Sequence, residues 1–193
     1  MTNSFLWSTE DHDTNLSQFK KKILHKIKDT SYASLHDWSV KNKSDFWSAI
    51  WDFTSIKGKI KQPIIENEKS FINSVFFKNS KLNFTENIIQ RKDRNDAIVF
   101  FSEQGFQRRI SWKKLDQNVS KIAQHFIDTN IKKGDRIVGV LPNIPETVIA
   151  FLAAAKIGAI WSSCSADFGP KAIIDRFKQI KPKVLLISDY YFY

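Results

Sequence analysis

The stretch that decides the fold runs Arg136-Ile-Val-Gly-Val-Leu141, then Pro142, then a nearly all-apolar segment that extends to Ile157. The first run is short, apolar and rich in β-branched residues, which predicts a buried β-strand. Proline ends that strand, and the longer apolar segment predicts a helix. Asn143 and Glu146 have the spacing of a capping box, so we expect the helix to begin there.

The same alternation continues toward the C-terminus. A strand is expected over residues 159–163, then a helix that opens at Pro170, and then a further strand over residues 184–187. Strands and helices that alternate with short connections are typical of successive βαβ units, whose crossovers are right-handed. The sequence therefore predicts an α/β fold with a parallel sheet that is covered on both faces.

Before this region, the pattern predicts a β-hairpin and a long helix. Strands are expected over residues 97–101 and 107–110, and Ser111 is placed to cap the helix that follows. The apolar residues of this helix recur at helical spacing and predict one core face, made of Leu115, Val119, Ile122, Ala123, Phe126 and Ile127.

The N-terminal part reads as helices that are broken by loops. Apolar residues at helical spacing predict a first helix, with Leu16, Phe19, Ile23 and Ile27 on its core face. Ser44 is expected to cap a later helix, whose apolar stripe contains Phe46, Trp47, Ile50 and Trp51. Residues 56–70 are rich in Lys, Gly, Pro and Glu, which predicts a surface linker, and a short helix is expected over residues 83–90.

The composition limits the class of protein. Of the 193 residues, 42% are hydrophobic and 13% aromatic, which excludes global disorder. The net charge of +10 is spread evenly, because residues 1–94 and 95–193 each carry +5. Lysines outnumber arginines 24 to 6, whereas bidentate phosphate and base contacts favour arginine. We therefore expect a lysine-rich solvated surface and no nucleic-acid partner.

The expected location is cytoplasmic. The single cysteine, Cys164, excludes an internal disulfide and suits a reducing compartment. The N-terminal residues show no export signal, and the longest strongly apolar run, residues 148–155, is too short to span a bilayer. No membrane partner is expected.

The common phosphate-binding and catalytic motifs are absent from the sequence. Gly134 and Gly139 have the glycine spacing of a phosphate loop, but Val140-Leu141 stands where Lys and Ser/Thr are required. The four histidines are scattered, so no metal site is expected. The sequence also lacks the G-x-S-x-G motif of serine hydrolases, and no catalytic residue is assigned in this chain. Ligands of open α/β sheets gather beyond the carboxyl ends of the strands. There, Asp167 precedes a helix N-terminus, either as part of a ligand site or as a local cap.

Two long stretches carry a family resemblance. They are Lys133-Gly-Asp-Arg-Ile-Val-Gly-Val-Leu-Pro-Asn-Ile-Pro-Glu146 and Gly158-Ala-Ile-Trp-Ser-Ser-Cys-Ser-Ala-Asp-Phe-Gly169. Shorter stretches agree: Asp37-Trp-Ser-Val40, Phe46-Trp-Ser-Ala-Ile-Trp-Asp-Phe53, Lys81-Leu-Asn-Phe-Thr-Glu-Asn87, Arg109-Ile-Ser-Trp-Lys113 and Asp175-Arg-Phe-Lys-Gln-Ile-Lys-Pro-Lys183. The chain resembles the adenylate-forming acyl-CoA synthetases and, among them, the acetoacetyl-CoA synthetases. It departs from their pattern at Ala166, where proline is usual, and at Lys78-Asn79-Ser80, where Pro-Gly-Ala is usual.

The resemblance implies a two-step ligase whose substrates are acetoacetate, ATP with Mg²⁺, and coenzyme A. Residues 1–94 would be the helical N-terminal region with its linker, and residues 95–193 the truncated N-terminal part of an AMP-binding (adenylation) domain. The phosphate loop and the catalytic lysine of the family lie downstream of the matched part. The remainder of the adenylation domain and the C-terminal domain would then be the partners of this chain.

The same resemblance names residues of one loop as lining for the acyl and coenzyme A side of the site. These residues are Trp161, Ser165, Asp167, Phe168 and Gly169. Their implied role is to shape the site and not to make or break bonds.

A fragment is expected, because the apolar strand over residues 184–187 is followed only by Ser188, Asp189 and the aromatic run at residues 190–193. Alone, it is expected to aggregate and to show no acetoacetate-dependent ATP–pyrophosphate exchange. Three alternatives stay open: a synthetase for another short-chain acid such as acetate or propionate, a non-catalytic basic binding module, and an interaction domain that dimerises through its open sheet edge.

Overall fold

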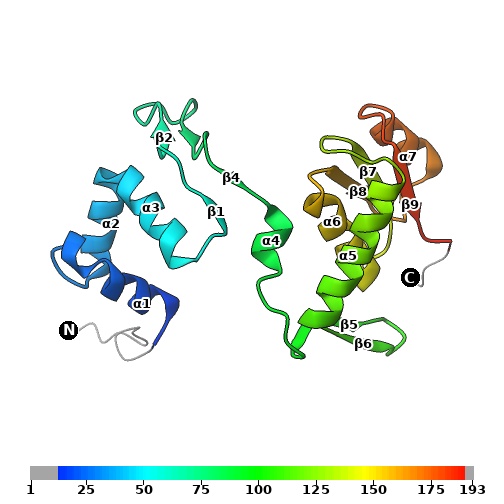
Figure 1. Ribbon diagram of the computed structural model, residues 1–193, viewed down its shortest axis with the longest axis horizontal. Helices are drawn as coiled ribbons and strands as arrows, with labels where there is room; N and C mark the ends of the chain where they lie inside the picture. The colour runs from blue at the N-terminus through cyan, green and yellow to red at the C-terminus, as the bar shows by residue number, and fades with distance from the viewer. Residues whose placement is uncertain (1–12, 190–193) are drawn as a thin grey trace, which may run out of the picture. The chain divides into compact units, whose positions relative to one another are not determined.

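A computed structural model describes residues 13–189, which belong to two compact units, Met1–Lys81 and Leu82–Tyr193 (Figure 1). The aromatic run at residues 190–193 lies outside the described residues. The sequence-based boundary at residue 94 falls inside the second unit, because α4 (Phe84–Ile88) belongs to that unit by its contacts. A functional division at residue 94 stays a prediction.

In its described residues, the first unit is built on three α-helices. They are α1 (Asn15–Lys22), α2 (Tyr32–Lys41) and α3 (Lys43–Phe53), and the short 3₁₀ helix η1 (Leu24–Lys26) follows α1. The helix expected to carry Leu16, Phe19, Ile23 and Ile27 ends earlier, because Ile23 is already its C-cap. The four residues expected on the first core face, Leu16, Phe19, Ile23 and Ile27, pack in one cluster with Leu35 and Trp38. Of the expected aromatic stripe, Phe46 and Ile50 join this cluster, whereas Trp47 is exposed.

The cap expected at Ser44 is wrong. Helix α3 begins at Lys43, and Asn42 is its N-cap without a side-chain hydrogen bond. The Asn42 side chain instead donates to the carbonyl oxygen of Trp38 at 3.1 Å, which caps the end of α2. The two helices follow each other so closely that one residue serves both ends.

The expected surface linker is only partly a linker. It contains β1 (Gly58–Lys59) and β2 (Ile65–Glu66), and β2 pairs antiparallel with β3 (Val75–Phe76). Ile64 and Ile65 are buried, and the N–H of Phe77 donates to the carbonyl oxygen of Ile64. The rings of Phe77 and Trp51 lie 5.0 Å apart, so part of the aromatic stripe of α3 packs on this hairpin.

The second unit begins at Leu82, the last residue of β4 (Lys81–Leu82), and α4 is its first helix. The order of the elements after α4 matches the sequence prediction. The unit contains the antiparallel hairpin of β5 (Asp96–Phe101) and β6 (Gln107–Ser111), then α5 (Trp112–Asp128), β7 (Arg136–Val140), α6 (Pro145–Lys156), β8 (Ile160–Cys164), α7 (Pro170–Phe177) and β9 (Val184–Ile187). The sheet has the order β8-β7-β9, and both pairings are parallel. The predicted α/β fold is confirmed.

Two apolar clusters lie on opposite faces of this sheet, because successive side chains of a strand alternate in direction. Ile137 of β7 belongs to the large cluster beneath α5 and α6, and Val138 belongs to a smaller cluster beneath α7. Five of the six residues predicted for the core face of α5 lie in the large cluster, but Ile127 is exposed.

The capping box expected at Asn143 and Glu146 is wrong. The N-cap of α6 is Ile144, and Pro145 occupies the first helical position, where it has no N–H to satisfy. The Glu146 carboxylate accepts a hydrogen bond from Arg108 of β6 at 2.6 Å. The glutamate therefore ties α6 to the hairpin and not to its own helix start.

Two polar side chains attach α4 to the C-terminal end of α6. The buried hydroxyl of Thr85 donates to the carbonyl oxygen of Leu152 at 2.6 Å. The side-chain amide of Asn83 donates to the carbonyl oxygens of Ala155 and Lys156 at 3.1 and 3.0 Å. Ala155 and Lys156 are among the last four residues of α6, whose carbonyl groups have no partner within the helix.

Thr85→Val keeps the shape of this buried side chain and removes its donor. We expect the free energy of unfolding of the second unit to fall by about 1 kcal/mol, the usual net value of one buried hydrogen bond. Urea unfolding followed by circular dichroism measures the change. Thr129→Val is the matched control, since its hydroxyl bonds the His125 carbonyl at an exposed position, and an equal loss there would contradict the argument.

Candidate functional site

The carboxyl ends of β7, β8 and β9 lie at one edge of the sheet. Three loops leave this edge: residues 141–144, residues 165–169 and residues 188–189. Helix α6, which follows β7, covers one face of the sheet, whereas α7, which leads to β9, covers the other. The strand order therefore reverses between β7 and β9, and open α/β sheets bind ligands outside such a reversal.

A cleft of about 710 Å³ opens at this reversal. It lies between the tip of the β5–β6 hairpin and the loops that follow β7 and β9. Its lining combines aromatic, polar and charged side chains, among them Phe100, Phe101, Ser102, Phe106, Arg108, Asn143, Ile144, Glu146, Ser188 and Asp189. The ion pair of Arg108 and Glu146 spans it from hairpin to helix.

None of the five residues named from the sequence lines this cleft. Four of them, Ser165, Asp167, Phe168 and Gly169, form the neighbouring loop between β8 and α7, and all four are exposed. The sequence offered one signal for the cleft, the three phenylalanines around the hairpin turn. Their position in a cleft could not be predicted from the sequence, because the hairpin and α6 meet only in the folded chain.

Asp167 and Ser165 bind each other within this loop. The Ser165 hydroxyl donates to the Asp167 carboxylate. This hydrogen bond, with a further one from the backbone N–H of Asp167, holds the pKa of the carboxyl below its ordinary value. Gly169 is the N-cap of α7, and no side chain caps that helix. Asp167 is therefore not the local cap of α7 in this structure.

The rest of the loop is held against α7 and β8. The guanidinium carbon of Arg176 lies 4.6 Å from the ring centre of Phe168, which is the geometry of a cation–π contact. Burial raises the pKa of the Cys164 thiol, the last residue of β8. A buried thiol with a raised pKa is a poor nucleophile.

Trp161 stands apart from that loop. Its side chain packs against the large cluster under α6, and its ring centre lies 6.4 Å from that of Phe151. The indole also lies over Gly139 of the neighbouring strand, where a Cβ atom would come within 2.9 Å of two ring carbons. Gly139 is thus the glycine that makes room for the indole.

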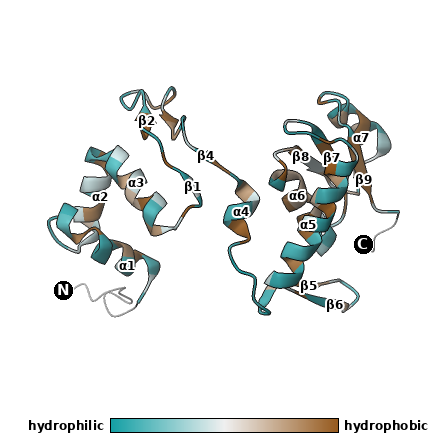
Figure 2. Ribbon diagram, viewed as in Figure 1, coloured by the Kyte–Doolittle hydropathy of each residue, from teal (hydrophilic) through white to brown (hydrophobic). Residues whose placement is uncertain are grey.

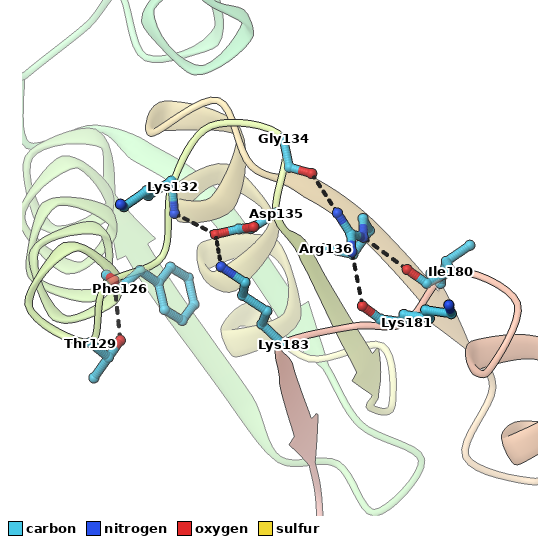
Figure 3. Close-up of polar contacts among 9 residues, drawn as sticks. All are labelled: Phe126, Thr129, Lys132, Gly134, Asp135, Arg136, Ile180, Lys181 and Lys183. Atoms are coloured by element: carbon cyan, nitrogen blue, oxygen red, sulfur yellow. Dashed lines mark hydrogen bonds and ion pairs between the residues drawn. The ribbon is translucent and has the colours of Figure 1, made fainter.

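The opposite edge of the sheet, at the amino ends of the strands, carries a network of charged side chains (Figure 3). The Asp135 carboxylate accepts hydrogen bonds from the Lys183 ammonium at 2.8 Å and from the backbone N–H of Lys132 at 2.7 Å. The Arg136 guanidinium donates to the carbonyl oxygens of Ile180 and Lys181. These contacts fix the turn that leads into β9.

Asp135→Asn removes the ion pair of this network. Lys183 and the Lys132 N–H lower the pKa of Asp135 from its ordinary 3.8. Their stabilising contribution is complete above pH 3.8 and is lost as the pH falls through the lowered pKa. We expect Asp135→Asn to lower the urea midpoint at pH 7, and the difference from wild type to shrink at pH 3. Asp128→Asn serves as the control, because the Asp128 carboxylate accepts a hydrogen bond from the Gln124 side chain and is not part of this network. A difference independent of pH would contradict the linkage.

Residues 13–189 do not supply a metal centre. In that range, no three carboxylate, histidine or cysteine side chains gather closely enough to hold an ion. No helix in the described range has the length and apolar character that a bilayer span requires.

The sequence profile of a family described as "AMP-binding enzyme" matches residues 85–191, more than half of the chain. The chain belongs to the AMP-binding enzyme family. The match contains the parallel sheet, the loop of residues 165–169 and all the residues that line the cleft.

Several acetoacetyl-CoA synthetases are similar to this chain. The chain is 38% identical over 162 residues to acetoacetyl-coenzyme A synthetase of Rhizobium meliloti, which covers 84% of this chain and 25% of the relative. It is 37% identical over 159 residues to acetoacetyl-CoA synthetase of Rattus norvegicus, which covers 80% and 24%. The chain spans about a quarter of the length of the curated relatives it matches.

Solved structures of AMP-binding enzymes agree. Acetoacetyl-CoA synthetase from Streptomyces lividans matches with a TM-score of 0.86 and 28% identity, covering 94% of this chain and 29% of that chain. An acyl-CoA synthetase from Brucella canis matches with a TM-score of 0.52 and 27% identity, covering 55% and 20%. The chain therefore has the fold of the N-terminal part of an acetoacetyl-CoA synthetase.

Proposed function

We propose that this chain is part of an acid–thiol ligase that joins acetoacetate to coenzyme A. In the first half-reaction, the acetoacetate carboxylate attacks the α-phosphorus of ATP, which gives acetoacetyl-AMP and pyrophosphate. In the second, the coenzyme A thiolate attacks the acyl carbonyl and releases AMP. The observation that carries the proposal is the 38% identity to an acetoacetyl-coenzyme A synthetase over most of the chain.

The chain's own residues would shape the site and leave bond-making to other residues. In this proposal, the loop of Ser165, Asp167, Phe168 and Gly169 lines the acyl and coenzyme A side, and Trp161 is a further lining residue. The loop's exposure at the carboxyl end of β8 supports this role. Mg²⁺ would neutralise the ATP phosphates, but its ligands are not assigned to this chain. The ligase would act in the cytoplasm.

A chimera tests the function. The matched N-terminal part of the Streptomyces lividans enzyme is replaced by residues 1–193, and acetoacetate-dependent ATP–pyrophosphate exchange is measured. We expect exchange in the chimera, and none from residues 1–193 alone or from the remainder alone. Acetate and propionate in place of acetoacetate address the alternative substrates. A well-folded chimera without exchange on any of the three acids would refute the proposal.

Asp167→Ala in the active chimera tests the loop. We expect the KM for coenzyme A to rise about tenfold, as for the loss of one hydrogen-bonded group at the site, while pyrophosphate exchange stays unchanged. Asp175→Ala is the control, because Asp175 pairs only with nearby Lys178 on the exposed side of α7. Unchanged coenzyme A kinetics in Asp167→Ala would remove the loop from the site.

A further inference from the structure

The sheet of the second unit is covered unevenly at β9. In the parallel register, Leu185 lies beside Val138 and Ile187 lies beside Val140, so each pair points to the same face. Val138 and Val140 are buried beneath α7, whereas Leu185 is 51% exposed and Ile187 is 65% exposed. On this face, helix α7 therefore covers β7 but not β9.

The other face of β9 is covered. Val184 and Leu186 pack against the large cluster beneath α5 and α6. One strand thus presents a buried apolar row on one side and an exposed apolar row on the other. Parallel sheets are normally buried on both faces, so the exposed row is unusual for this fold.

The backbone edge of β9 is open as well. Within the described range, β9 pairs with β7 alone and forms an edge of the sheet. Edge strands of soluble proteins usually carry a charge, a proline or a bulge that prevents further pairing. The sequence of β9, Val-Leu-Leu-Ile, contains no polar residue and is brown along its length in Figure 2. The opposite edge strand, β8, contains Ser162 and Ser163.

Leu185, Ile187 and the open edge of β9 are together called the β9 surface. We propose that the β9 surface is a docking site for the polypeptide that follows the matched region in acetoacetyl-CoA synthetases, and that the two associate even as separate chains. This inference rests on the proposed function. The Streptomyces lividans enzyme has the same backbone over 94% of this chain, yet that match is only 29% of its own length. It therefore supplies ample polypeptide to pair with β9 and to cover its exposed row.

Co-expression of residues 1–193 with the affinity-tagged remainder of the Streptomyces lividans enzyme tests this docking. We expect the two polypeptides to co-purify in equimolar amounts. Leu185→Lys with Ile187→Lys should reduce recovery by about tenfold or more, because the lysines would be buried without partners. Ile127→Lys is the matched control, since Ile127 is 52% exposed on α5, and its recovery should equal that of wild type.

A second measurement separates lost docking from lost folding. Alone, the double lysine variant should keep the wild-type circular dichroism spectrum and become more monodisperse in light scattering, because an exposed apolar row is removed. Leu185→Thr with Ile187→Thr, which places β-branched side chains that suit a strand at both positions, should weaken co-purification in the same direction.

The docking proposal would be overturned by no co-purification of the wild-type chain, or by equal recovery of wild type and both double variants. Saturation of the surface by a second copy, seen as a defined dimer that excludes the remainder, would also overturn it. If the covalent chimera is active but the separate chains fail to bind, the docking proposal is refuted and the proposed ligase function stands. If the separate chains bind but the chimera is inactive, the docking proposal stands and the proposed ligase function is refuted.

Discussion

Phe177→Ala is expected to lower the free energy of unfolding of the second unit by about 3–5 kcal/mol, the usual cost of removing a buried phenylalanine. Phe177 is 8% exposed and is the largest side chain of the small cluster beneath α7, with Val138, Val140 and Cys164. A cluster of this size has few other contacts through which α7 could stay attached to the sheet. The loss should therefore lie near the upper end of the range.

The effect of Phe177→Ala should reach the candidate site. Loop residues 165–169 connect β8 to α7, so a loosened α7 leaves Asp167 without a fixed position. In the chimera, we expect the KM for coenzyme A to rise, with a smaller change in pyrophosphate exchange. Ile174→Ala on the same helix is the control, because Ile174 is exposed, and its effect on stability should stay within about 0.5 kcal/mol. Similar losses for both variants would show that α7 is held by something other than Phe177.

Gly139→Ala is expected to cost about 1–3 kcal/mol, the range for added volume in a packed interior. The new methyl group would lie 2.9 Å from ring carbons of Trp161 and 3.3 Å from a side-chain carbon of Leu141. Gly139 sits in the middle of the central strand, so the backbone has little freedom to retreat. The indole would have to move, and it packs against the large cluster.

A double-mutant cycle identifies the clash. Trp161→Phe removes part of the indole, so the Gly139→Ala and Trp161→Phe double variant should be more stable than the sum of the single losses predicts. Gly105→Ala is a poor control because Gly105 has a positive φ, whereas Gly169→Ala has an extended backbone and no atom near the new methyl group. Additive losses in the cycle would mean that the tryptophan is not the obstacle.

The periodic parts of this fold could be predicted from sequence, because their pattern depends on residues that are close together in the chain. Apolar spacing within a short stretch of chain indicates which residues are buried. This holds for the strand at residues 136–141, for the helix after it, and for Leu115, Val119 and Phe126. Parallel order follows from alternating strands and helices, because each helix must return the chain to the same end of the sheet.

The features that could not be predicted depend on contacts distant in sequence. Glu146 has the spacing of a capping box, but Arg108 lies 38 residues away and binds it in the folded chain. Ile127 continues the apolar stripe of α5, yet spacing does not reveal where the covering element stops. The cleft has the same origin, since its walls come from the hairpin and from two loops of the sheet.

The residues of the loop at 165–169 were named from family resemblance, and their role stays a prediction. The structure adds the partners of the loop: Ser165 bonded to Asp167, and Phe168 under Arg176. Spacing alone allowed two roles for Asp167, a ligand-site residue or the cap of the helix that follows. Its bond to Ser165 removes the capping role and leaves the ligand role to the kinetic test.

The order β8-β7-β9 has a consequence for the time course of folding. β7 is synthesised first, yet both of its neighbours arrive later, each after a helical crossover. The β7–α6–β8 unit closes a shorter loop on its own, whereas β9 must join an edge that stays open in the meantime. Pulse-labelled hydrogen exchange during refolding should therefore protect the amides shared by β7 and β8 before those shared by β7 and β9, and simultaneous protection would show that the three strands condense together.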